Sequence, residues 1–363
     1  MAISTIGASG LNSAVSQIGK NLVHNGELTV SQRALPITGL GAGSGYTFDR
    51  WKYESSGSPT GRHTVSRGTG ILNAASSLRI DVTTADSSLA SNALYQMTQK
   101  IEAQDLHFLE FGSATAKAFT ISFTMKSNFD GAFTLYLIAA DGSRSYARPI
   151  NLTGDESQET FECTIPGDTS GAFNFDNGVG LDLMITLAAG SGFAGGTQNA
   201  WAASNNNMYG ASNSGNFFSS TDNYVEFSLV QLEVGSVATD FEHETIGVTL
   251  AKCQRWFYRL QESDTNSLGI GSGGYMSTTL ADVLVAFPVE MRAAPTMSVS
   301  AVGDFKVQAN SQVNDSTGMA TVFAGSTLTS VLRVTTGSAA GGEGVVLRTD
   351  GSAGGFIQYS AEI

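Results

Sequence analysis

The chain has 363 residues, of which 41% are hydrophobic and 14% charged, and this composition excludes an intrinsically disordered protein. The formal net charge of −13 and the lack of a basic run argue against a nucleic-acid partner, because binding to phosphates needs clustered Lys and Arg. No apolar stretch approaches the roughly 20 residues of a membrane span, so no membrane insertion is expected.

The first segment, 1–20, is rich in Gly, Ser and Ala, and its apolar residues are too loosely spaced to predict a helix. Two interpretations stay open. The segment is either a partly ordered arm or a docking and oligomerisation segment that becomes ordered on a large assembly or on sister chains. It lacks a charged start followed by an apolar core, so it does not resemble a signal peptide, and we expect synthesis and folding in a cytoplasm.

The β-domain is predicted to start at Asn21, with NLVHNGELTVSQRA, and a second motif, YTFDRW, begins at Tyr46. A glycine-rich stretch, Gly39–Gly45, lies between these two motifs. No buried strand leads into this stretch and no helix follows it, so it lacks the context of a phosphate-binding loop. We expect a flexible connection there.

Alternating apolar and polar residues then predict a series of strands. The clearest is Ala118–Lys126, whose apolar residues from Phe119 to Met125 share one face. The other strands are predicted at Ser77–Thr83, Phe133–Ala139, Gln158–Ile165 and Val179–Leu187. Short strands at roughly ten-residue spacing indicate two antiparallel sheets packed face to face, and we expect a jelly roll.

The segment from Ala189 to Thr221 is long for a loop inside a compact domain, and such loops are usually functional or disordered. It is rich in Gly and Asn and carries the aromatic residues Trp201, Tyr209, Phe217 and Phe218. Aromatic rings stack on sugar rings and Asn side chains bond to hydroxyls, so these four residues are candidate glycan ligands. The alternative is that they pack beneath the loop or against a neighbouring subunit.

The next stretch predicts the end of this domain. Tyr224–Val234 alternates as a strand, but its apolar phase slips by one residue, which indicates a bulge. Apolar spacings of three, four and three from Leu250 onward predict a helix over Thr245–Leu260. Trp256, Phe257 and Tyr258 cannot all lie on one face of that helix, so they are candidates for contact with another domain or another chain.

Residues 265–363 predict a second β-domain, an antiparallel β-sandwich. Its strands are expected at Tyr275–Thr279, Val283–Phe287, Thr296–Val302, Phe305–Ala309, Thr321–Ala324, Ser330–Thr335, Gly344–Arg348 and Gly355–Ile363. The fold prediction is therefore all-β: an arm at 1–20, a jelly roll at 21–243, a short linking helix within 244–264 and a sandwich at 265–363. The cysteines Cys163 and Cys253 fall on different elements, so buried free thiols are expected.

Several motifs resemble bacteriophage tail-fibre and related virion proteins. The segment QLEVGSVATDFE, which starts at Gln231, and CQRWF, which starts at Cys253, resemble the junction that follows a carbohydrate-binding-module-like jelly roll in that family. The opening motifs at Asn21 and Tyr46, and FPVEMRAAPT from Phe287, are similar to other parts of the same proteins. The residues that carry the first two resemblances are Gln231, Leu232, Glu233, Gly235, Ala238, Thr239, Phe241, Glu242, Cys253, Gln254, Arg255, Trp256 and Phe257.

The resemblance implies a virion structural protein, a tail fibre or similar appendage, that forms a homotrimer, contacts other virion proteins and attaches to host-surface polysaccharide. A capsid decoration or tail adaptor protein is the alternative. The resemblance also suggests a structural Ca²⁺ near the first and last strands of the jelly roll. Glu27, Asp240 and Glu242 fall in the matching regions, and oxygen ligands from separate segments suit calcium, although exposed acids would look the same.

Signals of catalysis are weak. His24, His63, His107 and His243 have no paired spacing for zinc, and no required cofactor is predicted. The acids of 155–162 would matter in a glycan depolymerase, the third hypothesis, but they fall in a turn and on the solvent face of a strand. We therefore expect a wet surface there and no catalytic residues.

Overall fold

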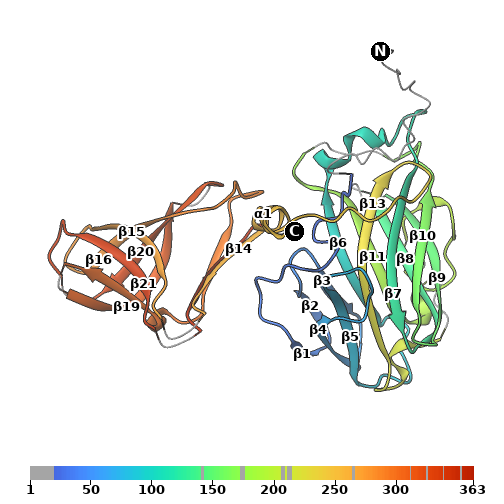
Figure 1. Ribbon diagram of the computed structural model, residues 1–363, viewed down its shortest axis with the longest axis horizontal. Helices are drawn as coiled ribbons and strands as arrows, with labels where there is room; N and C mark the ends of the chain where they lie inside the picture. Colours follow the sequence, from blue (N-terminus) through green and yellow to red (C-terminus); the bar gives the residue numbers. More distant parts are fainter. Residues whose placement is uncertain are drawn as a thin grey trace, which may run out of the picture. The chain divides into compact units, whose positions relative to one another are not determined.

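The computed structural model describes residues 20–139, 143–171, 176–205, 209–210, 215–263, 266–310, 312–323, 326–337, 339–351 and 354–363. The predicted arm lies outside these residues except for Lys20. The chain divides into two compact units, Met1–Ile246 and Gly247–Ile363, and the division falls inside the range 244–264 that the sequence assigns to the link (Figure 1). Among the described residues, no helix is long and apolar enough to cross a membrane.

The first unit is a sandwich of two antiparallel sheets. The six-stranded sheet has the order β1 (Ile37–Leu40), β4 (Arg62–Gly68), β5 (Ser77–Thr84), β13 (Tyr224–Val234), β7 (Phe119–Ser127) and β10 (Gln158–Ile165). The seven-stranded sheet has the order β12 (Trp201–Ala203), β9 (Arg144–Thr153), β8 (Asp130–Ala139), β11 (Val179–Ala189), β6 (Leu94–Glu102), β3 (Lys52–Ser56) and β2 (Gly43–Tyr46). Short 3₁₀ helices lie at Ala103–Leu109, Ser191–Phe193 and Phe217–Ser219.

One hydrophobic core fills the space between these sheets. The apolar faces predicted for β7, from Phe119 to Met125, and for β11, from Leu181 to Leu187, both belong to it. Burying each such side chain stabilises the fold by about 1.5–3 kcal/mol. Cys163 is a buried free thiol in the same core, as predicted. The all-β class is therefore confirmed, and so are the inward faces of its most regular strands.

The bulge predicted in β13 is confirmed. Its pairing with β7 shifts between Ser228 and Gln231, and Leu229 has a positive φ of 56°. The shift turns Val230 toward the start of the described chain, where its amide donates to the carbonyl of Gly26 over 2.9 Å. The phase slip thus marks the point where one edge of β13 leaves β5 and bonds to Leu22 and Gly26, while its other edge stays paired with β7.

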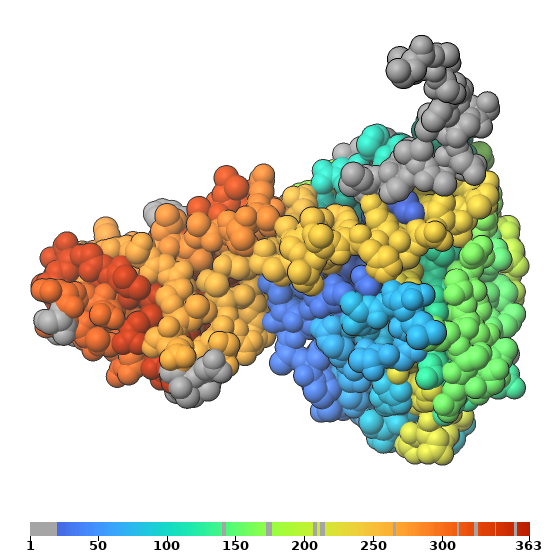
Figure 2. Space-filling model, viewed as in Figure 1, coloured from blue at the N-terminus to red at the C-terminus, as the bar shows by residue number. Residues whose placement is uncertain are grey.

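Residues 239–242, which precede α1 (Ile246–Gln254), lie against the beginning of the described chain. Figure 2 shows blue residues there among yellow ones. Lys20 Nζ donates to Thr239 Oγ1 (2.5 Å) and to the carbonyl of Asp240 (2.6 Å). The amide of Asn21 donates to a carboxylate oxygen of Glu242 over 2.9 Å. The first and last segments of the sandwich are therefore joined by hydrogen bonds.

The prediction of a flexible connection at Gly39–Gly45 was wrong. β1 ends at Leu40 in one sheet and β2 begins at Gly43 in the other, where Gly43 pairs with Ser55 and Gly45 with Tyr53. Gly43 and Gly45 are paired backbone, and glycines without side chains concealed two short edge strands.

The second unit contains α1 (Ile246–Gln254), a three-stranded sheet and a closed barrel. The sheet has the order β14 (Phe257–Gln261), β22 (Phe356–Ser360) and β17 (Thr296–Val299). The barrel has the order β15 (Gly269–Tyr275), β16 (Leu280–Ala286), β20 (Thr329–Thr336), β19 (Gln312–Phe323), β18 (Phe305–Ala309) and β21 (Gly344–Thr349). A 3₁₀ helix lies at Val302–Asp304.

The barrel replaces the open sandwich expected for residues 265–363, and β19 explains why. This strand has 12 residues, and its first part pairs with β18 while its later part pairs with β20. It therefore joins both ends of the sheet. The sequence predicted only its end, Thr321–Ala324, because the polar stretch from Asn314 to Thr317 hides the rest.

The helix predicted over Thr245–Leu260 ends earlier, at Gln254, and Phe257 begins β14. Aromatic residues favour strands, and Phe257 pairs with Ser360 of β22. Trp256 and Phe257 are buried, and the Arg292 guanidinium lies 5.3 Å from the Trp256 ring. Tyr258 packs against Phe287 and Tyr359. The helical-face argument for these aromatics therefore fails, and these contacts lie within one unit.

Candidate functional site

The outer face of the seven-stranded sheet, which points away from the sandwich core, carries a second apolar cluster. Tyr136 of β8, Met184 of β11 and Ala147 of β9 are buried there, and Ile138, Ala202 and Tyr209 pack against them. Side chains alternate between the faces of a strand, so Tyr136 points outward between Leu135 and Leu137, which belong to the core. We call this surface the outer sheet face.

Strand register places polar residues beside this cluster. In one row across the sheet, Lys52 of β3 pairs with Thr98 of β6, Thr98 with Met184, and Met184 with Tyr136. The rows on either side pair Glu54 with Gln96 and Lys100 with Asp182. The outer sheet face is thus apolar around Tyr136 of β8 and Met184 of β11, and polar over β3, β6 and the Asp182 position of β11; Figure 1 labels these strands.

The charged residues of the polar half neutralise one another. Lys52 Nζ donates to Glu54 Oε1 over 2.7 Å, and Gln96 Nε2 donates to Glu54 Oε2 over 3.0 Å. Lys100 Nζ lies 3.9 Å from Asp182 Oδ1. The four charges sum to zero, so the surface offers hydrogen-bonding groups without a strong field of either sign.

Among the described residues, three polar atoms of the outer sheet face are buried without a hydrogen-bond partner. One is Asp182 Oδ1, which lies 3.9 Å from Lys100 Nζ. The other two are Gln96 Oε1, an acceptor, and Tyr136 Oη, which can donate and accept. A buried polar atom without a partner costs about 1–3 kcal/mol, and most such atoms in folded proteins are satisfied. Gln96 Oε1 and Tyr136 Oη are both closed to solvent, so a ligand that carries hydroxyl groups would satisfy them only after neighbouring side chains move aside.

Burial shifts the pKa values of two residues on this face. Burial raises the pKa of Asp182 to about 6, with a smaller contribution from the Glu54 carboxylate, against the opposing effects of Lys100 and Lys52. Burial also raises the pKa of Tyr209 to about 12, and the neighbouring Tyr136, Asp182 and Glu54 add to that shift. These mutual effects mean that the aromatic residues and the carboxylates lie close enough to interact.

Of the four aromatic residues predicted to bind glycan, Tyr209 lies on the outer sheet face. Its ring is 4.5 Å from that of Tyr136, and Phe193 packs edge-on against it at 5.8 Å. Trp201 lies on the opposite side of its sheet, because it pairs with the core residue Tyr146 and its indole N–H donates to the carbonyl of Pro166 over 2.7 Å.

Phe217 and Phe218 are core residues, which corrects their prediction as glycan ligands. Both are fully buried: Phe217 packs edge-on against Phe133 at 5.4 Å, and Phe218 stacks on Tyr95 at 3.7 Å. Asn216 turns the chain inward here, since its Oδ1 accepts from the amide of Phe218 and its Nδ2 donates to the carbonyl of Asp86. The packing alternative is therefore the correct one for this pair.

The three acids considered for calcium do not form a shared site in the described part of the chain. The Glu27 carboxylate accepts from the amide of Ala75 (2.9 Å) and lies 3.3 Å from His243 Nδ1. The Glu242 carboxylate accepts from Asn21, and Asp240 contributes its carbonyl to Lys20. Among the described residues, no group of three or more His, Cys, Asp or Glu side chains gathers to hold a metal ion.

The acids of 155–162 lie on the surface as expected. Asp155, Glu156 and Glu162 are exposed, and Glu159 is half-buried and accepts from Thr153. They do not line a cleft with the outer sheet face, since they belong to the turn and strand of the other sheet.

The sequence missed Tyr136, Gln96 and Asp182. A signal was present: Tyr136 and Met184 are large apolar residues in the outward phase of strands whose inward phase is already apolar. A large apolar residue in the outward phase indicates that this part of the outer face is covered or binds something.

Comparisons with known proteins give no family for this chain. No protein-family model and no curated protein matches it. Among solved structures, the enzymatically active domain of tailspike protein 4 from bacteriophage CBA120 is similar over 60% of this chain and 22% of that chain, with 11% identity and a TM-score of 0.31. This chain therefore spans well under two thirds of that tailspike structure.

Two further similar structures are carbohydrate-binding modules. A family 11 module of a cellulosomal cellulase from Clostridium thermocellum is similar over 56% of this chain and 99% of the module, with 15% identity and a TM-score of 0.27. A family 4 module is similar over 51% of this chain and 87% of the module, with 16% identity and a TM-score of 0.28. These values are too low to assign a function to this chain.

Proposed function

We propose that this chain is a non-enzymatic structural protein of a bacteriophage virion, a tail fibre or similar appendage, whose outer sheet face attaches to a host-surface polysaccharide. The motifs at Asn21, Tyr46, Gln231 and Cys253 support the virion assignment. In this proposal the chain is made in the bacterial cytoplasm, assembles as a homotrimer and contacts other virion proteins. Glycan binding does not require a cofactor.

One observation carries the glycan part of the proposal: Gln96 Oε1 and Tyr136 Oη are buried without partners beside an apolar cluster. Sugars combine apolar C–H faces with hydroxyl groups. A pyranose ring would pack on Tyr209, whose side chain is partly exposed. Its hydroxyls would bond to Gln96 Oε1 and to the fully buried Tyr136 Oη after the side chains that cover these atoms move aside. Contacts of this kind are individually weak, and several copies on one virion would make them effective.

The proposal is tested by measuring binding of the full chain to host-cell polysaccharide. We expect Gln96→Leu and Tyr209→Ala each to weaken binding by roughly tenfold or more, the effect of one lost hydrogen bond or ring contact of about 1.4 kcal/mol or more. Gln158→Leu is the matched control, because Gln158 is exposed on the other sheet. Equal binding by all variants would refute the assignment of this face.

The adaptor or capsid decoration alternative keeps the virion role without sugar binding. It predicts that host-cell polysaccharide does not bind even the unmutated chain, while the chain still associates with purified virion components. Imaging of labelled subunits on intact particles then places the protein on the tail or on the capsid.

A glycan depolymerase is a second candidate, favoured by one observation: burial and the Glu54 carboxylate raise the pKa of Asp182 to about 6. Glycosidases need one protonated and one ionised carboxyl group at the reacting bond. This hypothesis predicts release of sugar fragments from host polysaccharide, lost in Asp182→Asn. Binding without fragment release favours attachment instead.

A further inference from the structure

The outer wall of the barrel carries a row of exposed aliphatic residues. Register places Val346 of β21 opposite both Gln308 of β18 and Ser272 of β15, and Ser272 opposite Leu284 of β16. Leu284 is 51% exposed and Val346 is 45% exposed. The row also includes Val313 of β19, opposite Gln308, which is 48% exposed. It contains no charged residue.

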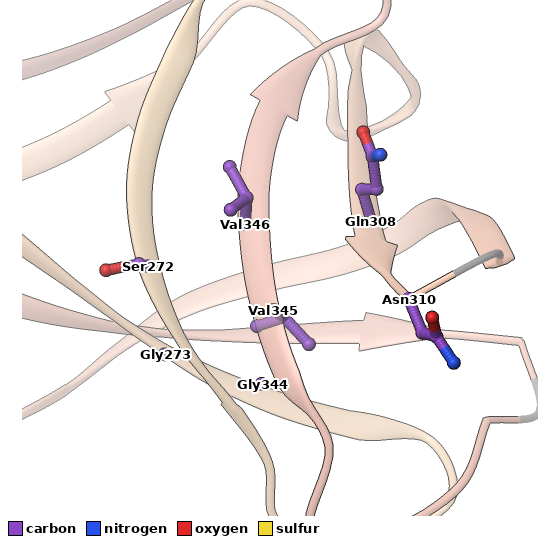
Figure 3. Close-up of a pocket in the computed structure, with 7 residues that line it drawn as sticks. All are labelled: Ser272, Gly273, Gln308, Asn310, Gly344, Val345 and Val346. Carbon is purple, nitrogen blue, oxygen red and sulfur yellow. The ribbon is translucent and has the colours of Figure 1, made fainter.

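A hollow lies in the same wall, over Gly273 and Gly344, with Ser272, Gln308 and Val346 at its edge (Figure 3). A Cβ on Gly273 would lie 1.8 Å from the carbonyl oxygen of Asp282, so no larger residue fits at this position. Gly344 faces open space instead, since the nearest atom to its Cβ position is the Gly273 carbonyl oxygen at 4.0 Å.

The barrel wall thus carries a ridge and a hollow side by side. Leu284 stands next to Ser272 on one side of β15, and the hollow begins on the other side of Ser272. When one molecule bears both a projecting apolar side chain and a pocket on different patches, copies related by rotation can fit head to tail and close into a ring. A second copy of this chain therefore matches both features.

The charge distribution favours the same occupant. The unit Gly247–Ile363 has 7 basic and 9 acidic residues, a net charge of −2, whereas the rest of the chain has 12 basic and 23 acidic residues, a net charge of −11. Near the row, Arg333 forms two hydrogen bonds to Asp282, and Lys306 lies 3.6 Å from Asp315. Two barrels can approach with little repulsion, whereas two sandwich units would repel.

We propose that the barrel wall is the contact surface between copies of this chain, with Leu284 of one copy packed in the Gly273–Gly344 hollow of the next. This inference rests on the homo-oligomeric part of the proposed function and is independent of glycan binding. The contact buries the aliphatic row, whose exposure to water is otherwise unfavourable.

The test is the mass of the full chain in solution, by sedimentation and light scattering over a concentration series. The unmutated chain is expected to form a closed oligomer. Leu284→Lys places a charge on the ridge, and Gly344→Gln fills the hollow without a clash in its own chain. Each should weaken self-association by roughly tenfold or more, because each removes the packing of Leu284 in the hollow.

Two controls match these variants. Leu72→Lys changes an exposed leucine of the sandwich, and Gly303→Gln changes a glycine whose Cβ position has no atom within 4 Å. Both should assemble as the unmutated chain does, and circular dichroism should show all four variants folded. If Leu284→Lys fails to fold, the self-association of Gly344→Gln alone tests the contact.

Two outcomes overturn the inference. A chain that stays monomeric up to about 100 μM, the range of weak association, removes both this contact and the homotrimer, while glycan binding remains testable by the Gln96 variant. An oligomer that persists in Leu284→Lys and Gly344→Gln removes the barrel-wall contact alone and leaves the proposed function in place.

Discussion

At the residue scale, the outer sheet face combines features that lower the stability of the chain. Gln96 Oε1 and Tyr136 Oη lack partners, and Asp182 is a carboxylate whose ionised form is disfavoured by burial. Substitution of such groups by matched uncharged or apolar ones commonly stabilises a protein, and the usual loss is in function. Their presence together on one surface therefore supports a binding role.

A stability measurement tests the burial of Asp182. Its pKa in the folded chain, about 6, lies above the ordinary value of 3.8. The folded state thus binds a proton more tightly, so this group's stabilising contribution is complete below about pH 4 and is lost as the pH rises through 6. We expect Asp182→Asn to gain stability relative to the unmutated chain between pH 4 and 7, by at most about 3 kcal/mol.

Urea unfolding of both proteins at pH 4.5 and pH 7.5 measures this difference. Asp222→Asn, a change at an exposed aspartate, should show no such pH-dependent gain. A stability difference between Asp182→Asn and the unmutated chain that is the same at both pH values would contradict a raised pKa.

At the element scale, the accuracy of sequence-based prediction depended on how regular each strand is. β7 and β11 were predicted closely because one face is continuously apolar and the other differs from it. The phase slip in the apolar pattern of β13 predicted its bulge correctly. Short glycine-rich strands such as β2 and β15 were missed, since a glycine leaves no side chain whose spacing could be recognised. The helix end was misplaced because Phe257 and Leu260 continue the helical spacing of the apolar residues, although both belong to β14, where they fall on opposite faces.

The candidate site was harder to predict than the fold. Tyr209 was found because it is an aromatic residue in a long loop. Tyr136, Gln96 and Asp182 come from three different strands, and only the register of β6, β11 and β8 places them together. Phe217 and Phe218 are also aromatic residues of this long loop, so the sequence does not distinguish them from Tyr209. They are buried because the chain turns inward at Asn216, and the sequence does not reveal this turn.

The β13 bulge gives a prediction at this scale. A Cβ on Gly26 would lie 2.0 Å from the carbonyl oxygen of Val230, so Gly26→Ala must displace backbone at the bulge. We expect a loss of about 2–4 kcal/mol in the free energy of unfolding. Gly247→Ala is the control, because its Cβ would meet no atom within 4 Å in α1, where alanine is favoured over glycine by about 1 kcal/mol. Chemical denaturation of the two variants measures both effects, and equal stability would contradict the close approach.

At the scale of the whole molecule, each unit has its own main hydrophobic core among the described residues. Residues of the sandwich core and of the barrel core do not overlap, and each core lies within one unit. Each unit therefore has the apolar burial needed to unfold cooperatively by itself.

Calorimetry tests this independence. We expect Leu183→Ala, in the sandwich core, and Leu332→Ala, in the barrel core, to shift different thermal transitions, each by the effect of about 2–5 kcal/mol typical of a buried leucine. A single transition that both substitutions shift equally would show that the cores unfold as one.

The division also separates the proposed roles. The sandwich holds the outer sheet face and most of the negative charge, and the barrel holds the nearly neutral wall with its exposed aliphatic row. A binding face on one unit and a contact between copies on the other would give a multivalent appendage, in which several weak sugar sites act together.

The most direct test of the central claim is a crystal structure of this chain with an oligosaccharide prepared from the host-cell polysaccharide that it binds. The expected result is a sugar ring on the outer sheet face, packed on Tyr209, with a hydroxyl within hydrogen-bond distance of Gln96 Oε1. A sugar bound elsewhere, with Gln96 and Tyr136 unchanged, would contradict it.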